Sequence, residues 1–80
     1  MATLTLYSRR SCPACEEMIA ELEFAPLGAA VALDVIDVDS DAQLAAQYGW
    51  HVPVLLLDGD EVCRHELDLE ALLARLNKPG

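Results

Sequence analysis

The sequence has no long apolar run and few basic residues. No stretch reaches the roughly 18 uninterrupted apolar residues of a membrane-spanning helix. Strand-like residues follow Met1 in place of a basic region and an apolar export segment, so a cytoplasmic location is expected. Five lysines and arginines against 14 acidic residues give a net charge of -9 at pH 7. This charge repels nucleic acid and anionic membranes, and we expect neither as a partner.

Cysteine is also scarce. The three cysteines, Cys12, Cys15 and Cys63, cannot close the disulfide framework of a small secreted fold. A reducing compartment with one special pair fits them better. Cys12 and Cys15 are held apart by two residues in the stretch YSRRSCPAC. That spacing leaves three interpretations open: a redox couple, half of a metal site, or two buried cysteines that are close by chance.

What is present is an ordinary globular composition. The chain has 80 residues, of which 54% are hydrophobic and 24% are charged. These values argue against disorder and leave no room for a second domain. We therefore expect one domain over residues 1–80, and a monomer.

Apolar spacing predicts alternating strands and helices. Short runs of aliphatic and β-branched residues predict strands at 3–7, 31–38, 54–57 and 61–65. After Cys12, one helical stripe comprises Cys15, Met18, Ile19 and Leu22. Pro13 suits its first position, and Pro26 and Gly28 close it. Another stripe comprises Leu69, Leu72, Leu73 and Leu76, with Asp68 as its cap and Arg75 and Lys78 favouring its dipole.

A short helix is predicted between the second and third strands. Ser40 and Gln43 match a capping box, in which both side chains satisfy free N–H groups at a helix start. Leu44, Ala45 and Tyr48 form its expected inner face, and Gly49 ends it. The predicted order of elements is therefore βαβαββα.

This order predicts an α/β fold with a mixed four-stranded sheet. The first β-α-β unit implies a parallel pair with a right-handed crossover, and the turn at Asp58-Gly59 adds an antiparallel hairpin. We expect three helices to flank the sheet, on both faces. The loop after the first strand, at its carboxyl end, is a usual place for a site, and it leads into Cys12 and Cys15.

The helix start gives the cysteine pair a chemical setting. Free N–H groups and a partial positive charge stabilise a thiolate, which makes Cys12 the candidate nucleophile. Cys15, one turn further, can attack a mixed disulfide on Cys12 and is the candidate resolving thiol. Arg9 and Arg10 favour the thiolate, whereas Glu16 and Glu17 just beyond the pair oppose a second negative charge.

Two separated motifs carry a family resemblance. YSRRSCPAC after the first strand, and HVPVLLLDG about forty residues later, resemble the glutaredoxins and glutaredoxin-like proteins of the thioredoxin superfamily over nearly the whole chain. The resemblance implies a thioredoxin-like fold and a thiol–disulfide oxidoreductase, with Cys12 as nucleophile and Cys15 as resolving cysteine. It implies no bound cofactor, and glutathione as a candidate co-substrate.

The resemblance also implies substrate contacts. Arg9 matches a basic residue near the glutathione carboxylate, and Val52-Pro53 matches a cis-proline step whose backbone pairs with the substrate. The alternative for Pro53 is an ordinary trans proline that opens an edge strand. The chain departs from the family at Ala14, where glutaredoxins usually have tyrosine, and in CRHELDLE, where they have a Gly-Gly turn that holds glutathione.

Other residues near the motifs have two interpretations each. Arg10 and His51 are candidate substrate contacts, and a solvated loop position is the alternative for both. Trp50 is expected to be a partly buried packing residue rather than a substrate platform. Cys63 is expected to pack on the sheet, because free cysteine is among the most buried residue types. The spacing of Cys63 and His65 is unlike the second half of a zinc site. No metal site is predicted.

The sequence thus predicts a small dithiol oxidoreductase. Its expected partner is a disulfide-containing protein or a low-molecular-weight thiol such as glutathione. A redox-sensitive binding module with little turnover is the main alternative, motivated by Ala14 and the absent Gly-Gly turn. An iron–sulfur or metal carrier ranks last, because the proline after Cys12 does not favour it.

Overall fold

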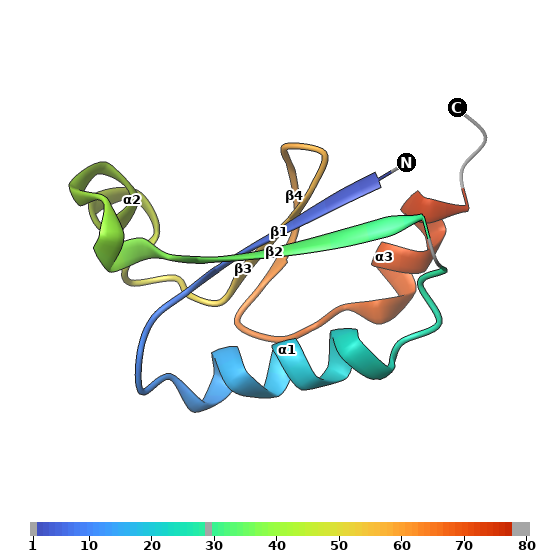
Figure 1. Cartoon of the computed structure of the whole chain (residues 1–80), viewed down its shortest axis with the longest axis horizontal. Coiled ribbons are helices and arrows are strands. Elements are labelled where there is room, and N and C mark those ends of the chain that lie inside the picture. Colours follow the sequence, from blue (N-terminus) through green and yellow to red (C-terminus); the bar gives the residue numbers. More distant parts are fainter. Residues whose placement is uncertain (1, 29, 78–80) are drawn as a thin grey trace.

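Four strands form one mixed sheet in the order β2-β1-β3-β4 (Figure 1). The central strand β1 (Ala2–Ser8) runs parallel to β2 (Val31–Asp37) and antiparallel to β3 (Val54–Leu57). Strand β3 pairs antiparallel with β4 (Asp60–Arg64). The computed structural model describes residues 2–28 and 30–77. The predicted strands are confirmed, with ends shifted by one residue.

The described residues also form three α-helices and one short 3-10 helix. Helix α1 (Pro13–Phe24) joins β1 to β2, and the 3-10 helix η1 (Val38–Ser40) leads into α2 (Ala42–Tyr48). Helix α3 (Leu69–Leu76) follows the hairpin. The predicted order βαβαββα is confirmed, with η1 as an addition.

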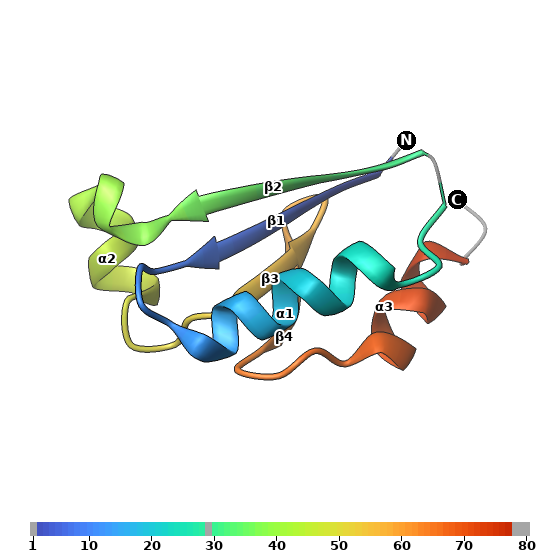
Figure 2. The ribbon, with the colours of Figure 1, turned by 60° about the horizontal axis from the view of Figure 1, so that its bottom comes forward.

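The core lies between one face of the sheet and two helices. Figure 2 shows α1 and α3 on the same side of the sheet. On that side, Leu4 and Leu6 of β1 and Leu55 of β3 are fully buried against α1 and α3. The helices contribute Met18, Leu22 and Leu72. Burial of each such side chain stabilises the fold by roughly 1.5–3 kcal/mol, which is why this cluster fixes the position of α1.

The opposite face of the sheet is covered only at one end. Helix α2 lies beyond the carboxyl ends of β1 and β2 (Figures 1 and 2). The rings of Tyr7 and Tyr48 stack there with their centroids 4.5 Å apart. None of the residues within α2 is fully buried, and its expected inner face is half-buried. The prediction of helices on both faces therefore holds for the second face only at this end.

The start of α2 differs from the predicted capping box. The cap is Asp41, whose carboxylate accepts a hydrogen bond of 2.8 Å from the backbone N–H of Gln43. The Ser40 hydroxyl instead donates to the backbone carbonyl of Asp37 across η1. Ser40 as the cap is wrong because η1 places it inside the preceding turn, whereas Asp41 has the extended backbone that a cap needs.

The last hairpin and helix agree with the sequence. Asp58 and Gly59 both adopt positive φ values in the turn between β3 and β4. Asp68 caps α3, because its carboxylate accepts a 3.0 Å hydrogen bond from the N–H of Ala71. Arg75 lies in the last turn of α3, and Lys78 lies outside the described residues.

Candidate functional site

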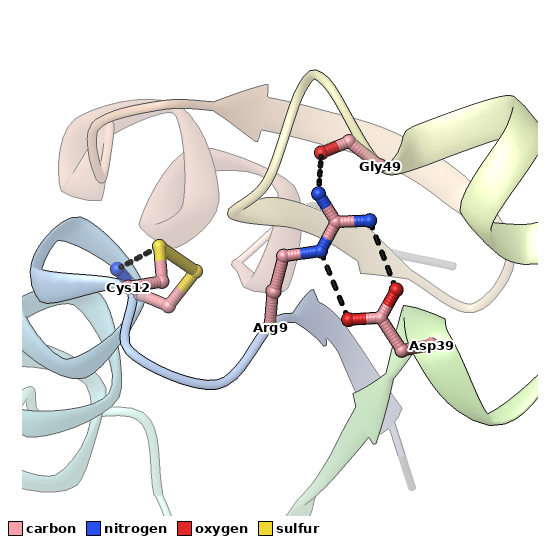
Figure 3. Close-up of a disulfide and its surroundings, with 5 residues drawn as sticks. Arg9, Cys12, Asp39 and Gly49 are labelled. Carbon is pink, nitrogen blue, oxygen red and sulfur yellow. Dashed lines mark hydrogen bonds and ion pairs between the residues drawn. A yellow bond between two sulfur atoms is a disulfide. The ribbon is translucent and has the colours of Figure 1, made fainter.

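The two cysteines lie at the start of α1, after the loop that follows β1. Cys12 is the cap of α1, and the backbone N–H of Cys15 donates to the Cys12 sulfur at 3.2 Å. The sulfur atoms are joined in a disulfide, with the Cα atoms 5.2 Å apart (Figure 3). Cys12 is half-buried, whereas Cys15 is only 1% exposed. A reagent from solution therefore has access to Cys12 and not to Cys15.

This geometry distinguishes the two sulfurs chemically. Pro13 occupies the first helical position and has no N–H, so the Cys15 N–H is the amide that contacts the Cys12 sulfur. In the reduced state this donor and the helix dipole stabilise a thiolate on Cys12. Cys15 is buried, which protects a resolving thiol from reagents in solution. The arrangement is suited to disulfide exchange.

Arg9 is held by groups on the far side of the loop. Its Nε and Nη2 donate to the two carboxylate oxygens of Asp39 at 3.0 and 2.9 Å, and its Nη1 donates to the Gly49 carbonyl at 3.1 Å. In Figure 3 the guanidinium points toward Asp39 and Gly49, away from the disulfide. We expected Arg9 to bind a glutathione carboxylate. In the structure its guanidinium already binds the carboxylate of Asp39.

Gly49 makes this contact sterically possible. A Cβ at this position would clash with the Ala45 carbonyl oxygen and lie 2.9 Å from Arg9 Nη2. The Gly49 backbone is helical, with φ near -54°. Space, and not a left-handed backbone, is therefore the reason that glycine follows α2. The sequence predicted its position at the helix end but not this role.

The Val52–Pro53 step precedes β3. Its peptide bond is cis, Pro53 is buried, and Val52 is half-buried. The Pro53 carbonyl accepts a 2.8 Å hydrogen bond from the N–H of His65, which ties this step to the end of β4. His51 is exposed, and its ring lies edge-on to that of His65, with 6.2 Å between the centroids.

Trp50 is exposed, contrary to the prediction from the sequence. The side chain is 88% exposed, so the expectation of a partly buried packing residue is wrong. The loop after α2 lies beyond the carboxyl ends of β1 and β2 (Figure 2). Trp50 follows Gly49, the residue that accepts from Arg9. An exposed indole in this loop is available to a binding partner.

An acidic groove lies beside the cysteine pair. It encloses about 270 Å³ between the start of α1 and the loop after β4. Ala14 contributes to its wall, and its ionisable residues are Glu17, Glu21, His65 and Glu66. His65 adopts a φ of 71°, so the turn forms without the Gly-Gly of glutaredoxins. This groove was not predicted from the sequence. The available signal was Glu17 and Glu21, which at i and i+4 lie on one face of the helix and make it acidic.

Cys63 belongs to a different environment. It packs beside the buried core cluster, as predicted, and its side chain is half-buried. Burial raises the pKa of the Cys63 thiol, and a hydrogen bond with the Asp68 backbone offsets part of that shift. A thiol whose pKa is raised is a poor nucleophile at neutral pH. Arg10, the remaining candidate contact, is exposed in the loop before Cys12.

The described residues contain neither a group of metal ligands nor a membrane-spanning helix. Within residues 2–28 and 30–77, no three or more histidine, cysteine, aspartate or glutamate side chains are grouped as a metal site would require. Cys63 and His65 belong to no such group there. None of the described helices has the length and apolar character needed to cross a bilayer.

Comparison with known proteins gives a consistent family. Residues 3–77 match the model described as Glutaredoxin-like domain (DUF836). The solution structure of protein Ne2328 from Nitrosomonas europaea is 35% identical, with a TM-score of 0.82, and the match covers 95% of this chain and 92% of that one. No match is found among curated protein sequences.

Two more solved structures extend the comparison. Protein XcR50 from X. campestris is also 35% identical, with a TM-score of 0.73 and coverage of 95% of this chain and 99% of that one. A mutant thioredoxin from Halobacterium salinarum NRC-1 is 29% identical, with a TM-score of 0.64 and coverage of 94% and 71%. The predicted thioredoxin-like α/β fold is confirmed.

Proposed function

The chain belongs to the glutaredoxin-like domain family, and we propose that it is a thiol–disulfide oxidoreductase whose redox couple is Cys12 and Cys15. One observation carries the proposal. The N–H of Cys15 points at the sulfur of the accessible Cys12, while Cys15 is buried within bonding reach of it. A nucleophile that is stabilised as a thiolate and an adjacent protected thiol are the two parts that exchange needs.

The reaction has two displacement steps. The Cys12 thiolate attacks one sulfur of a partner disulfide; a Cys12–partner disulfide forms, the partner bond breaks, and the first partner thiolate leaves. The Cys15 thiolate then attacks the Cys12 sulfur, closes the Cys12–Cys15 disulfide and releases the second partner thiolate. Two electrons pass from the protein dithiol to the partner, and water protonates the leaving thiolates. A reducing thiol reverses the sequence to restore the dithiol.

The proposal extends to the partner and the setting. The partner is a disulfide-containing protein or a low-molecular-weight thiol, with glutathione as one candidate and no resident cofactor. The protein acts as a monomer in the cytoplasm, where thiols are kept reduced. The net charge of -9 supports a function away from nucleic acid and anionic membranes.

Neighbouring residues are proposed to contact the partner. The half-buried Val52, next to Pro53, offers its backbone to an extended peptide. The exposed side chains of Arg10, before Cys12, and His51, before Val52, are available as polar contacts. These roles concern binding, so their substitution is expected to weaken partner affinity more than it slows the exchange step.

Three cysteine variants test the proposal, with Cys63→Ser as the control. Cys12→Ser should abolish reduction of a disulfide probe, because serine cannot form the mixed disulfide, whereas Cys63→Ser should retain turnover. Cys15→Ser should accumulate the probe as an adduct on Cys12, which intact-mass measurement detects. Full turnover by Cys12→Ser would contradict the proposal.

A redox-sensitive binding module is the second candidate. The 88% exposed Trp50 favours it, because such an indole serves a partner surface as readily as a small substrate. In that case the disulfide would form and break reversibly, yet turnover of disulfide probes would stay at the background rate. Affinity for a captured partner would then differ between the oxidised and the reduced protein.

A further inference from the structure

Arg9, in the loop that leads to the cysteine pair, is already bound to a carboxylate. Arg9 comes three residues before Cys12 in the loop between β1 and α1. Both oxygens of Asp39 occupy two of its donors, and the Gly49 carbonyl occupies a third (Figure 3). A bidentate guanidinium–carboxylate pair is directional and leaves little of the cation for another carboxylate.

The opposite side of the cysteine pair is acidic. Glu17, Glu21 and Glu66 line the groove whose wall includes Ala14, the residue between Cys12 and Cys15. Glu16, directly after Cys15, adds a further exposed carboxylate, and the basic groups of this region are Arg10 in the loop before Cys12, His65 in the groove wall and His51 beside it. The protein as a whole carries a net charge of -9. Anions are therefore repelled from the groove side and find Arg9 already paired.

We propose that Asp39 is a specificity-determining residue that withholds Arg9 from anionic thiols, so that the cysteine pair exchanges with positively charged segments of disulfide-bearing proteins in preference to glutathione. The inference rests on the proposed function and names its partner class. A glutathione carboxylate would have to displace Asp39 from Arg9, whereas a basic segment meets Glu17 and Glu66 directly.

Two small disulfides of opposite charge test this selectivity. Cystamine carries two ammonium groups, and 3,3′-dithiodipropionate carries two carboxylates on chains of similar length. Each is mixed with the reduced protein, and closure of the Cys12–Cys15 disulfide is followed by acid quenching and intact mass. For the unaltered protein, added salt should slow the reaction with cystamine and speed the reaction with dithiodipropionate.

Asp39→Ala isolates the contribution of the pair. The variant releases the two guanidinium donors that Asp39 binds and keeps the contact with the Gly49 carbonyl, so its rate with dithiodipropionate should rise about 3- to 10-fold over the unaltered protein. Its rate with cystamine should stay level or fall. The intrinsic reactivity of each probe cancels in the ratio of variant to unaltered protein. Glutathione disulfide should follow dithiodipropionate.

Two controls separate the effect of Arg9 from a general change in charge. Asp34→Ala removes the same charge from an exposed position on β2, and it should change either rate by less than about twofold. The double variant Arg9→Gln with Asp39→Ala should lose the gain, because no guanidinium remains to bind the carboxylate. Asp39→Asn serves as a second test of the same contact if Asp39→Ala does not fold.

The outcomes separate the two proposals. Equal rate changes in Asp39→Ala and Asp34→Ala, or a gain that survives in the double variant, would overturn the selectivity while disulfide exchange stands. Failure of both probes to close the Cys12–Cys15 disulfide would overturn the proposed function and the selectivity with it.

Discussion

The loop at the start of α1 and strand β4 place the same residue type in opposite settings. Cys12 is half-exposed at a helix start and accepts a hydrogen bond from the Cys15 amide. Cys63 is half-buried on β4 beside the apolar core, and burial raises the pKa of its thiol. Exposure of the two side chains is in the same intermediate class. The difference therefore lies in their surroundings: the Cys12 sulfur accepts from an amide at the start of α1, whereas the Cys63 sulfur packs beside the apolar core, where burial outweighs its hydrogen bond with the Asp68 backbone.

The reactivity of Cys12 depends on how α1 packs against the sheet. Helix α1 is held against the sheet by Met18 and Leu22, which are buried in the core cluster. That packing fixes the direction of the free amides at its start. Reactivity of Cys12 thus follows from apolar contacts more than one helical turn away, whereas Cys63 is a part of such contacts itself.

Alkylation rates should expose the largest difference between the two settings. In the reduced protein at pH 7, iodoacetamide should modify Cys12 faster than Cys63 by a factor on the order of 100, because the helix start stabilises the Cys12 thiolate whereas burial disfavours the thiolate of Cys63. Peptide mapping after timed quenching measures both rates in one sample. Equal rates would break the comparison, since they would mean that the helix start does not favour the thiolate.

A smaller effect is expected from Gly49→Ala. Alanine normally stabilises a helical position, but here its Cβ would clash with the Ala45 carbonyl and crowd Arg9. We expect the free energy of unfolding to fall by about 1–3 kcal/mol, as for other overpacked sites. Cys63→Ala removes one half-buried sulfur and should cost less than about 1 kcal/mol. Urea denaturation of both variants checks the order, and a stabilised Gly49→Ala would contradict the close approach.

The smallest expected effect is on alkaline stability. Burial raises the folded pKa of Cys63 above the ordinary value of 9.0. Its contribution to stability is therefore complete below that ordinary value and is lost as pH rises through the folded pKa. In the oxidised protein Cys12 and Cys15 do not titrate, so Cys63 is the thiol that matters. The melting temperature of Cys63→Ala should fall less between pH 8 and pH 10 than that of the unaltered protein; parallel curves would contradict the assignment.

Local patterns predicted most of the fold. The stripe of Cys15, Met18 and Leu22 and the turn at Asp58-Gly59 each depend on neighbours in sequence, and both agree with the structure. The predicted cap of α2, Ser40, was wrong. Ser40 and Asp41 are both residue types that cap helices well, and only the path of η1 decides between them. The expected burial of Trp50 was wrong because burial of an aromatic side chain depends on where its loop lies relative to the sheet, which the sequence pattern does not give.

The site was predicted less completely than the fold. Cys12 and Cys15 were placed correctly by their spacing and by Pro13 at the helix start. The Arg9–Asp39 pair joins positions 30 residues apart, and local patterns carry no information about such a contact. One signal was available: β1 and β2 are parallel with Ser8 opposite Asp37, so residues just beyond both strands meet at one edge. The groove required the β4–α3 loop to be placed in space.

The reduction potential of the Cys12–Cys15 couple tests the central claim most directly. The protein is equilibrated against dithiothreitol buffers of known potential, and the disulfide fraction is counted by trapping free thiols and measuring intact mass. If Cys12 and Cys15 exchange disulfides with a partner, we expect a reversible two-electron transition with a midpoint between roughly -180 and -270 mV, the range of exchange-active dithiols. Cys63 should stay a free thiol throughout. A midpoint below about -300 mV, typical of a structural disulfide, or no disulfide at any potential, would contradict the proposed exchange.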